Sequence, residues 1–420
     1  MSKHTYRAVE FQRLDWADLR QRIGGERVVL AVDAAKTGFV GSLMLESRQT
    51  LTTLKWSHPW DTRAFVACVE SLEAPVEVVM EPTGTYGDAV RRCLREAGFG
   101  VYRIAGKRVS DAKEVYDGVA SLHDGKSAYV LGRLHLEGVS SEWVEADARR
   151  RTLHAYANEL SHYCKRKQQA CNRIEALLAL SWPEFESIMG LQSVSGLRLL
   201  ASHGTPAAVA ADADGTGAQL RRVGGHWLAE AKIEALLASA ATSVGVPLVA
   251  AEAEQLQGLA DEVLAMQRQC RRLERLIGAQ AGEDEGLKQQ AAAVGAVTAM
   301  VLYAALGHPQ SYPNAGSYAK AAGLNLKEHS SGKFKGQLHL TKRGPSVVRF
   351  YLYYAALRLI SQLGPARRWY EVKVARDGGC RRKAITALMR KLIKALWHVG
   401  QGAAFDEALL FDDSTWQAVA

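Results

Sequence analysis

The sequence lacks the features that mark membrane, secreted and metal-thiolate proteins. Its apolar runs fall short of the roughly 20 residues that a membrane-spanning helix requires, and its N-terminal stretch has no apolar signal-peptide core. Its six cysteines are scattered, without a Cys-x-x-Cys pair and without histidines at zinc-ligand spacing. We therefore expect a protein of the reducing cytoplasm that has no membrane partner and no cysteine-based chemistry.

Acidic residues are scarce in one long stretch, from Lys320 to Lys394, which contains 18 Lys and Arg residues against three acidic ones. The whole 420-residue chain has a net charge of +9, so the rest of the sequence is net negative. A basic block of this kind is typical of a surface that binds nucleic acid. The cations that we predict to contact nucleic acid are Lys327, Lys333, Lys335, Lys342, Arg343, Arg349, Arg390, Lys391 and Lys394.

A Ser-Ser-Gly sequence at residues 330–332 lies within this basic block. A hydroxyl group among fixed positive charges is suited to attack on a phosphodiester, because the cations neutralise the charge that develops. Taken alone, the same residues are more readily explained as a surface turn with solvated lysines. Of the two serines, Ser331 is slightly favoured as a nucleophile, because the glycine after it allows backbone amides to approach a phosphate.

Residues 27–143 show the pattern of a mixed α/β domain. Three β-rich segments come first, followed by helix, strand, helix, strand and helix, which is the order of a ribonuclease-H-like sheet flanked by helices. The strands are predicted at residues 27–33, 40–46, 51–56, 76–81 and 101–105, and the helices at about 59–73, 86–97 and 124–136.

Three carboxylates fall at special positions of this predicted domain. Asp33 ends the first strand and Glu81 ends the fourth, and these strands are neighbours in a ribonuclease-H-like sheet. Asp124 opens the last helix and is in a position to close over the same place. Clustered carboxylates repel one another unless a cation lies between them, and such hard oxygen ligands select Mg²⁺ or Mn²⁺. A pair of these ions holds and polarises a phosphodiester in many enzymes.

The remainder of the sequence is predicted to be helical. Apolar residues from Leu256 to Ile277 keep a heptad rhythm, which indicates a coiled coil within one chain or between chains, or a helical hairpin packed on its own domain. We divide the chain into an N-terminal extension (1–26), the α/β domain (27–143), a helical coiled-coil region (144–284), a mostly helical C-terminal domain (285–400) and an acidic tail (401–420). An insert at 190–247, rich in Ala, Gly and Asp, is expected to contain a loop at 210–218.

Four segments resemble one known family. VLAVDAAK, VVMEPTGTYGDAVRRCLREAG, LHDGKSAYVLGRL and AAGLNLKEHSSGKFKGQLHLTKRG are similar to the sequence blocks of the DEDD-type insertion-sequence transposases. This family includes Piv-like DNA invertases and bridge-RNA-guided recombinases, and the resemblance covers about residues 27–138 and 288–400. It implies a RuvC-like domain in which Asp33, Glu81 and Asp124 are catalytic acids that bind Mg²⁺. It also implies that Ser331 attacks DNA and forms a covalent phosphoserine intermediate.

The resemblance also implies binding partners, and the chain departs from the family pattern at one position. Guided members bind a structured non-coding RNA that pairs with double-stranded target and donor DNA, and they work as dimers to tetramers at the nucleoid of a prokaryotic cell. The family's fourth acid falls three residues after Asp124, where this chain has Ser127, a weak neutral ligand. Asp88, Asp111 and Asp117 are candidates to replace the missing carboxylate, and nothing in the sequence selects among them.

Two alternative functions follow from the same residues. A metal-dependent nuclease of the Holliday-junction-resolving kind would cut DNA with an activated water molecule and would form no covalent adduct. A non-catalytic relative, with Ser127 marking a decayed metal site, would bind nucleic acid in a salt-dependent manner without cleaving it. An RNA-guided recombinase is the reading that we favour.

Overall fold

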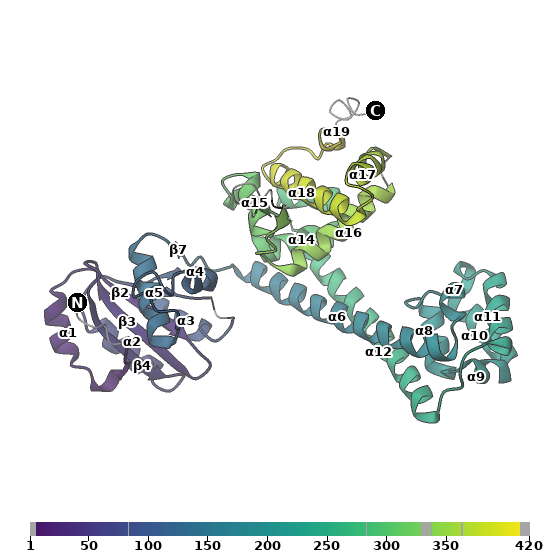
Figure 1. Cartoon of the computed structure of the whole chain (residues 1–420), viewed down its shortest axis with the longest axis horizontal. Coiled ribbons are helices and arrows are strands. Elements are labelled where there is room, and N and C mark those ends of the chain that lie inside the picture. Colours follow the sequence, from purple (N-terminus) through teal and green to yellow (C-terminus); the bar gives the residue numbers. More distant parts are fainter. Residues whose placement is uncertain are drawn as a thin grey trace. The chain divides into compact units, whose positions relative to one another are not determined.

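The computed structural model describes residues 6–82, 84–282, 284–328, 336, 338–362 and 364–411. The chain divides into two compact units, Met1–Glu145 and Ala146–Ala420 (Figure 1). The first is a mixed α/β unit and the second is almost entirely helical. In the part of the chain that is described, no helix combines the length and apolar character needed to cross a membrane.

The first unit is built on a seven-stranded mixed sheet with the order β1-β4-β3-β2-β5-β6-β7. The middle strand β2 pairs antiparallel with β3 and parallel with β5. It is buried along nearly its whole length, which explains its continuous apolar sequence. The sheet is consistent with the predicted ribonuclease-H-like order, to which β1 and β7 add short edge strands. The strands are β1 (Val9–Glu10), β2 (Val28–Ala34), β3 (Gly38–Leu45), β4 (Thr50–Ser57), β5 (Val76–Met80), β6 (Gly100–Arg103) and β7 (Ser141–Glu142).

Helices cover both faces of this sheet. Apolar residues of α1, α2 and α3 share a core with one face, and α4 and α5 pack on the other. Residues 6–26 belong to this fold and do not form a separate extension, because Phe11, Leu19 and Ile23 are buried in the first core. The helices are α1 (Trp16–Ile23), α2 (Thr62–Glu70), α3 (Asp88–Glu96), α4 (Gly106–Asp111) and α5 (Asp124–Leu136).

A long helical hairpin organises the second unit. Helices α6 (Ala148–Ser181) and α12 (Ala250–Gly278) lie side by side, so the heptad pattern pairs two helices of one chain (Figure 1). At one end the hairpin contributes Leu160 and Leu273 to the core of the C-terminal helices. At the other end it contributes Ile174 and Leu256 to the core of a small helical module. The hairpin is therefore shared by two separate cores.

The small module corresponds to the predicted insert and differs from it in one respect. The segment 210–218, expected to be a loop, is helical except at the junction of α9 and α10. The side chains of Thr205 and Asp212 accept hydrogen bonds from the backbone amides of Ala208 and Gly215, and so cap these two helices. Its helices are α7 (Phe185–Ile188), α8 (Val194–His203), α9 (Pro206–Ala211), α10 (Ala213–Gly224) and α11 (Glu230–Thr242).

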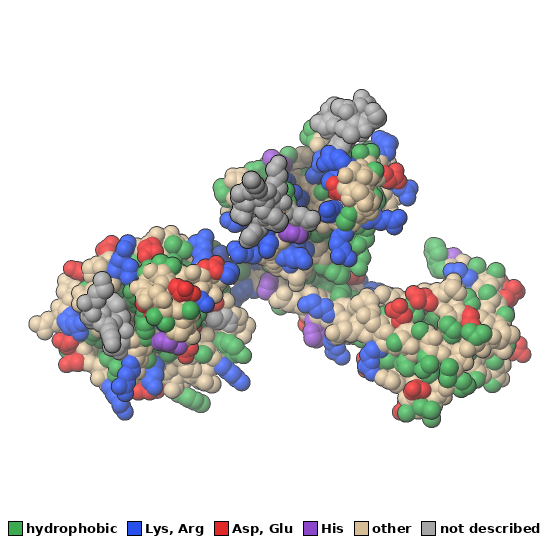
Figure 2. Space-filling model, viewed as in Figure 1, with side chains coloured by type: hydrophobic (Ala, Val, Ile, Leu, Met, Phe, Trp, Pro, Cys, Tyr) green, Lys and Arg blue, Asp and Glu red, His purple; other side chains and the backbone are tan. Residues whose placement is uncertain are grey.

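The C-terminal helices carry the basic block. Lys and Arg side chains are abundant on the face of this part seen in Figure 2. Gly295, with a positive φ of 85°, separates two consecutive helices of this part, α13 and α14. The elements are α13 (Glu285–Val294), α14 (Ala296–Leu306), α15 (Ala315–Ala321), β8 (Leu326–Lys327), β9 (His339–Leu340), α16 (Ser346–Gln362), α17 (Gly364–Arg376), α18 (Arg381–Gly400) and α19 (Glu407–Leu410). Short 3-10 helices occur at Phe11–Arg13, Gly225–Trp227, Ala279–Ala281 and Pro309–Ser311.

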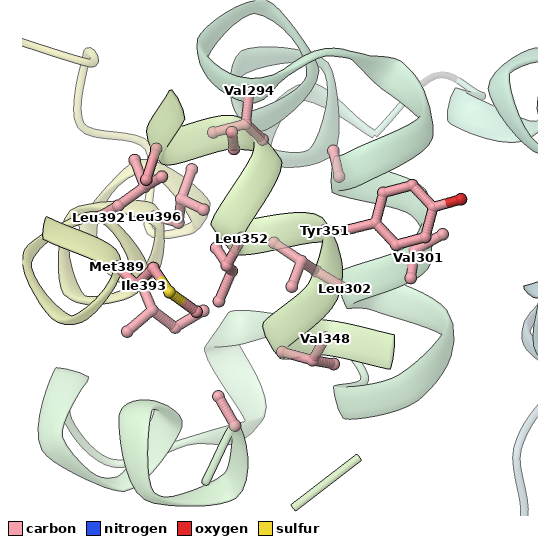
Figure 3. Packing of buried hydrophobic residues seen from close by; sticks show 14 of the residues in the cluster. Val294, Val301, Leu302, Val348, Tyr351, Leu352, Met389, Leu392, Ile393 and Leu396 are labelled. Carbon is pink, nitrogen blue, oxygen red and sulfur yellow. The ribbon is translucent and has the colours of Figure 1, made fainter. Parts of the chain in front are cut away.

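The core of these helices is aliphatic. Leu302 of α14, Leu352 of α16 and Leu392 of α18 meet in its centre (Figure 3). Beyond α18 the chain does not leave as a free acidic tail, because Leu410 and Phe411 are buried in the same core. The remaining tail residues, 412–420, lie outside the described part of the chain.

Candidate metal centre and nucleic-acid interface

The carboxylates of Asp33 and Glu81 leave the sheet at one edge. Asp33 is the penultimate residue of β2, and Glu81 directly follows β5. The two strands are parallel and paired as far as Val32 and Met80, so the next residues emerge side by side. Neighbouring parallel strands are thus the reason that two acids 48 positions apart in sequence come together.

Helix α5 brings the other two predicted residues to this edge. It packs closely on the central strands, since a Cβ at Gly132 would lie 3.3 Å from the Cβ of Ala31. Asp124 is its first residue and is exposed, and Ser127 is buried one turn further on.

Asp33 is influenced electrostatically by the other three residues. Burial, together with the nearby charges of Asp124 and Glu81, raises the pKa of Asp33 to about 6. The Ser127 hydroxyl donates a hydrogen bond to Asp33, which opposes this rise. Ser127 therefore favours the ionised form of Asp33.

The side chain of Glu81 packs closely against a glycine. Its carboxylate lies against Gly106 at the start of α4, and a Cβ at that position would be 1.7 Å from Oε1 of Glu81. Burial raises the pKa of Glu81. Among the described residues, no group of three His, Cys, Asp or Glu side chains is close enough together to hold a metal ion. The donors nevertheless fit a hard divalent cation in kind, because all are oxygens and the acids repel one another.

The three acids considered as replacements for the fourth carboxylate are engaged elsewhere. Asp88 accepts a hydrogen bond from Nη1 of Arg91 at 2.6 Å. Asp111 pairs with Lys107 one turn before it in α4. Asp117 is bound by Lys126, as described next. Each of the three carboxylates thus already has a cationic partner.

Lys126 is a structural residue that sequence reasoning missed. It is 1% exposed, and its ammonium group donates to Asp117 Oδ1 at 2.8 Å and to the Val119 carbonyl at 2.5 Å. Its hydrogen bond lowers the pKa of Asp117 to about 2, with help from the Val119 amide and the Tyr6 hydroxyl. Gly125 beside it approaches the Tyr6 carbonyl so closely that a Cβ would lie 2.3 Å away. This network fixes the start of α5, and hence Asp124 and Ser127.

The predicted nucleophile lies outside the described residues, as do Lys333 and Lys335. The strands on either side of this stretch, β8 and β9, pair antiparallel. Lys327, Lys342 and Arg343 are exposed close to these strands in sequence, and Lys394 is exposed on α18. These four cations are available to a phosphate backbone.

The other three described cations bind backbone carbonyls of their own domain. Arg349 donates to Gly344 at 2.8 Å, and burial lowers its pKa. Arg390 donates to the Leu324 carbonyl at 3.0 Å, and Lys391 donates to the Leu410 carbonyl at 2.7 Å. These hydrogen bonds tie loops to α16 and α18, so the three side chains contribute to the fold.

The turn around Gly344 explains part of the sequence signature. A Cβ at Gly344 would lie 2.3 Å from the Ala321 carbonyl, and Gly323 has a φ of 72°. The backbone of the Lys342–Gly344 turn therefore packs directly on the end of α15, which only glycine permits at these two positions.

A second basic surface lies between α17 and α18 and was only partly predicted. It contains a pocket of about 250 Å³ whose lining includes Trp369, Lys373 and Arg376 of α17 together with Lys394 of α18. Lys373 also pairs with Asp377. Because both helices line this pocket, Lys373 and Arg376 of α17 join the predicted cations of α18.

The mixed sheet with helices on both faces is consistent with the class of ribonuclease-H-like folds. Two family matches narrow this class. A DEDD transposase family of IS110 type matches residues 30–183, and the transposase IS116/IS110/IS902 family matches residues 289–371. Between them they cover more than half of the chain, and neither includes the helical module. The chain belongs to the DEDD-type insertion-sequence transposases, as its sequence blocks predicted.

A curated relative agrees with this assignment. The insertion element IS116 uncharacterized 44.8 kDa protein of Streptomyces clavuligerus is 24% identical over 261 residues. The alignment covers 59% of this chain and 62% of the relative, so it spans somewhat less than two thirds of that protein.

Proposed function

We propose that this chain exchanges DNA strands for its insertion element through a covalent phosphoserine intermediate at Ser331, with an RNA that selects the DNA sequence. The observation that carries the proposal is the convergence of Asp33, Glu81, Asp124 and Ser127 at one sheet edge. Such a cluster is costly to fold, because its carboxylates repel one another. A catalytic role accounts for its presence.

A divalent cation, Mg²⁺ in this proposal, would be held by Asp33, Glu81 and Asp124. When bound, it supplies positive charge that polarises a phosphodiester and stabilises the charge developing on its oxygens. Ser127 keeps Asp33 ionised and oriented through its hydrogen bond. Lys126 and Gly125 hold the helix start from which Asp124 projects.

The covalent step conserves the number of phosphoester bonds. The Ser331 hydroxyl loses its proton, its Oγ forms a bond to phosphorus, and the bond from phosphorus to one bridging oxygen breaks. That oxygen takes up a proton and becomes a free DNA hydroxyl. Attack by the hydroxyl of another DNA end reverses the step and releases Ser331. Because one ester replaces another, the exchange needs no external energy source.

The exposed cations suit this role without providing sequence recognition. In the proposal, Lys327, Lys333, Lys335, Lys342 and Arg343 bind phosphates, and lysine contacts to phosphates carry no sequence information. Sequence choice is therefore assigned to a structured guide RNA that pairs with target and donor DNA. The acids and Ser331 belong to different units of the chain, and we propose that a dimer or tetramer assembles them into complete sites.

Trapping of the covalent adduct tests the nucleophile. The protein, its guide RNA and end-labelled target DNA are incubated with Mg²⁺ and separated under denaturing conditions. We expect a protein–DNA species that Ser331→Ala abolishes and that the neighbouring variant Ser330→Ala retains. An adduct that survives Ser331→Ala would show that the assignment is wrong. Free 5′-phosphate ends without an adduct would instead indicate a nuclease.

The guide is tested separately. The protein is purified from cells that carry its element, and the bound RNA is sequenced. One discrete structured RNA, with segments complementary to the element's ends and insertion site, supports the proposal. A random sample of cellular RNA contradicts guided recognition, whatever the outcome of the adduct experiment.

A further inference from the structure

A groove runs between α6 and α16 within the second unit. Its deeper part is a pocket of about 370 Å³, lined among others by Lys165, Lys167, Phe350 and Tyr354. It continues into a hollow of about 360 Å³ that shares Lys165 and Ser346 and adds His162. Both hollows lie within the second unit and are lined mainly by residues of α6 and α16.

Two aromatic side chains stand exposed at this groove. Phe350 is 42% exposed and Tyr354 is 51% exposed, although both belong to the helix that forms the centre of the core. Their ring centroids are 4.9 Å apart at an interplanar angle of 63°. Exposing two neighbouring aromatic rings to water is unfavourable, because apolar surface is poorly solvated. An exposed pair of this kind therefore indicates a ligand that covers it.

The remaining lining is cationic or neutral. None of the described residues that line the two hollows is acidic, and the polar ones include Gln168, Gln192 and Asn158. Glu274 of α12 interacts electrostatically with Lys167 but does not line the groove. Rings next to lysines, with neutral hydrogen-bonding groups between them, match the chemistry of unpaired nucleotides, which have flat bases and negative phosphates.

We propose that the groove between α6 and α16 binds a single-stranded nucleic-acid segment, with bases stacked on Phe350 and Tyr354 and phosphates on Lys165 and Lys167. A duplex keeps its bases stacked inside and cannot offer them to these rings. The inference rests on the proposed function only in requiring a nucleic-acid partner, and it does not depend on the chemistry of Ser331. The unpaired strand belongs to RNA or to opened DNA, which share this chemistry.

Binding of short oligonucleotides tests the groove in the full-length protein. Fluorescein-labelled strands of about 16 nucleotides, one RNA and one DNA of the same sequence, are titrated by anisotropy beside the matching DNA duplex. We expect Phe350→Leu and Tyr354→Leu each to weaken single-strand binding on the order of 10-fold, and to change duplex binding less than about 2-fold. The strand that loses more affinity identifies the source.

Matched controls lie on the same helices. Tyr353→Leu removes a ring that is 39% exposed on α16 but is not part of the lining, and it is expected to bind as the wild type does. Lys165→Gln should reduce the salt dependence of single-strand binding by about 0.7 in log–log slope. Arg166→Gln, its neighbour outside the lining, should change single-strand affinity less than Lys165→Gln.

Three results would overturn the inference. The first is unchanged single-strand binding in both Leu variants, and the second is an equal loss for single strands and duplex. The third is a change of molar mass in light scattering without a change in binding, which would make the groove a contact between copies of the chain. Failure of the adduct experiment above would leave this result standing, so the two proposals fail independently.

Discussion

The acids of the first unit and the cations of the second unit are used in opposite ways. Asp33, Glu81 and Asp124 are brought together by regular elements and destabilise one another. The cations of the basic block are divided, since Arg349, Arg390 and Lys391 bind backbone carbonyls and others remain exposed. Acidic side chains that are held close together although they repel one another indicate a functional site. Basic side chains that donate hydrogen bonds to backbone carbonyls indicate a structural role, even within a segment that is basic throughout its sequence.

The sharpest test of the acid cluster is Asp33→Asn, which should have the largest effect. We expect DNA cleavage to fall at least about 100-fold, because the developing charge is no longer compensated. The same change should raise the free energy of unfolding by about 2 kcal/mol at pH 7.5 in EDTA. Because the pKa is raised, ionisation of Asp33 costs its full amount of stability above about pH 6, and this cost disappears as the pH falls from about 6 to the ordinary value of 3.8.

Activity assays and urea denaturation measure the two effects of Asp33→Asn. Asp18→Asn, an exposed acid on α1, is the control and should change stability by less than about 0.5 kcal/mol. If the Asp33→Asn variant lost stability as well as activity, the Asp33 carboxylate would be a structural group. The acids would then stabilise the fold as Arg349, Arg390 and Lys391 do.

Arg349→Met and Lys342→Met separate structural from exposed cations. Arg349→Met leaves the Gly344 carbonyl without its charged donor and should lower the free energy of unfolding by about 1–3 kcal/mol. Lys342→Met should change it by less than about 0.5 kcal/mol while weakening DNA binding. Urea denaturation and anisotropy with labelled DNA provide the two measurements. A stable Arg349→Met variant that loses DNA binding would place Arg349 among the phosphate ligands.

Ser127→Asp should have the smallest effect, and it asks whether the fourth acid can be restored. A carboxylate beside Asp33 should strengthen divalent-metal binding on the order of 10-fold and should lower stability in EDTA. The increase in melting temperature on adding MgCl₂ measures the affinity, because a ligand that binds only the folded state stabilises it. Ser127→Ala is the control, and it removes only the hydrogen bond to Asp33. An unchanged metal response would mean that position 127 is not a ligand position.

The sheet and its acid edge could be predicted because they depend on local pattern and on a known strand order. Short apolar, β-branched runs that each lead to an acid predicted β2 and β5, and parallel pairing of these strands then brought Asp33 next to Glu81. The loop expected at 210–218 was wrong, because Thr205 and Asp212 cap helices whose Ala- and Gly-rich sequence has little periodicity.

The use of individual charges could not be predicted. Whether Arg349 contacts phosphate or the Gly344 carbonyl depends on where α15 and the turn after β9 meet, which no sequence spacing reveals. The burial of Lys126 was equally hidden, because its partner Asp117 comes from a loop before α5. Gly125 and Gly106 gave the only sequence signal, since a glycine beside a site acid suggests a close backbone or side-chain approach.

The number of residues in the α6–α12 hairpin sets the direction in which the small helical module points relative to the C-terminal helices. Leu160 and Ile174 lie on the same helix but face different cores, and each residue of an α-helix advances the face by about 100°. Deleting one residue from both helices between the cores would swing the module a quarter-turn or more about the hairpin axis. Deleting seven from each would leave its direction within about 20° and only shorten the arm. Insertions or deletions in these two helices should therefore be tolerated when they comprise seven residues, or a multiple of seven, in each helix.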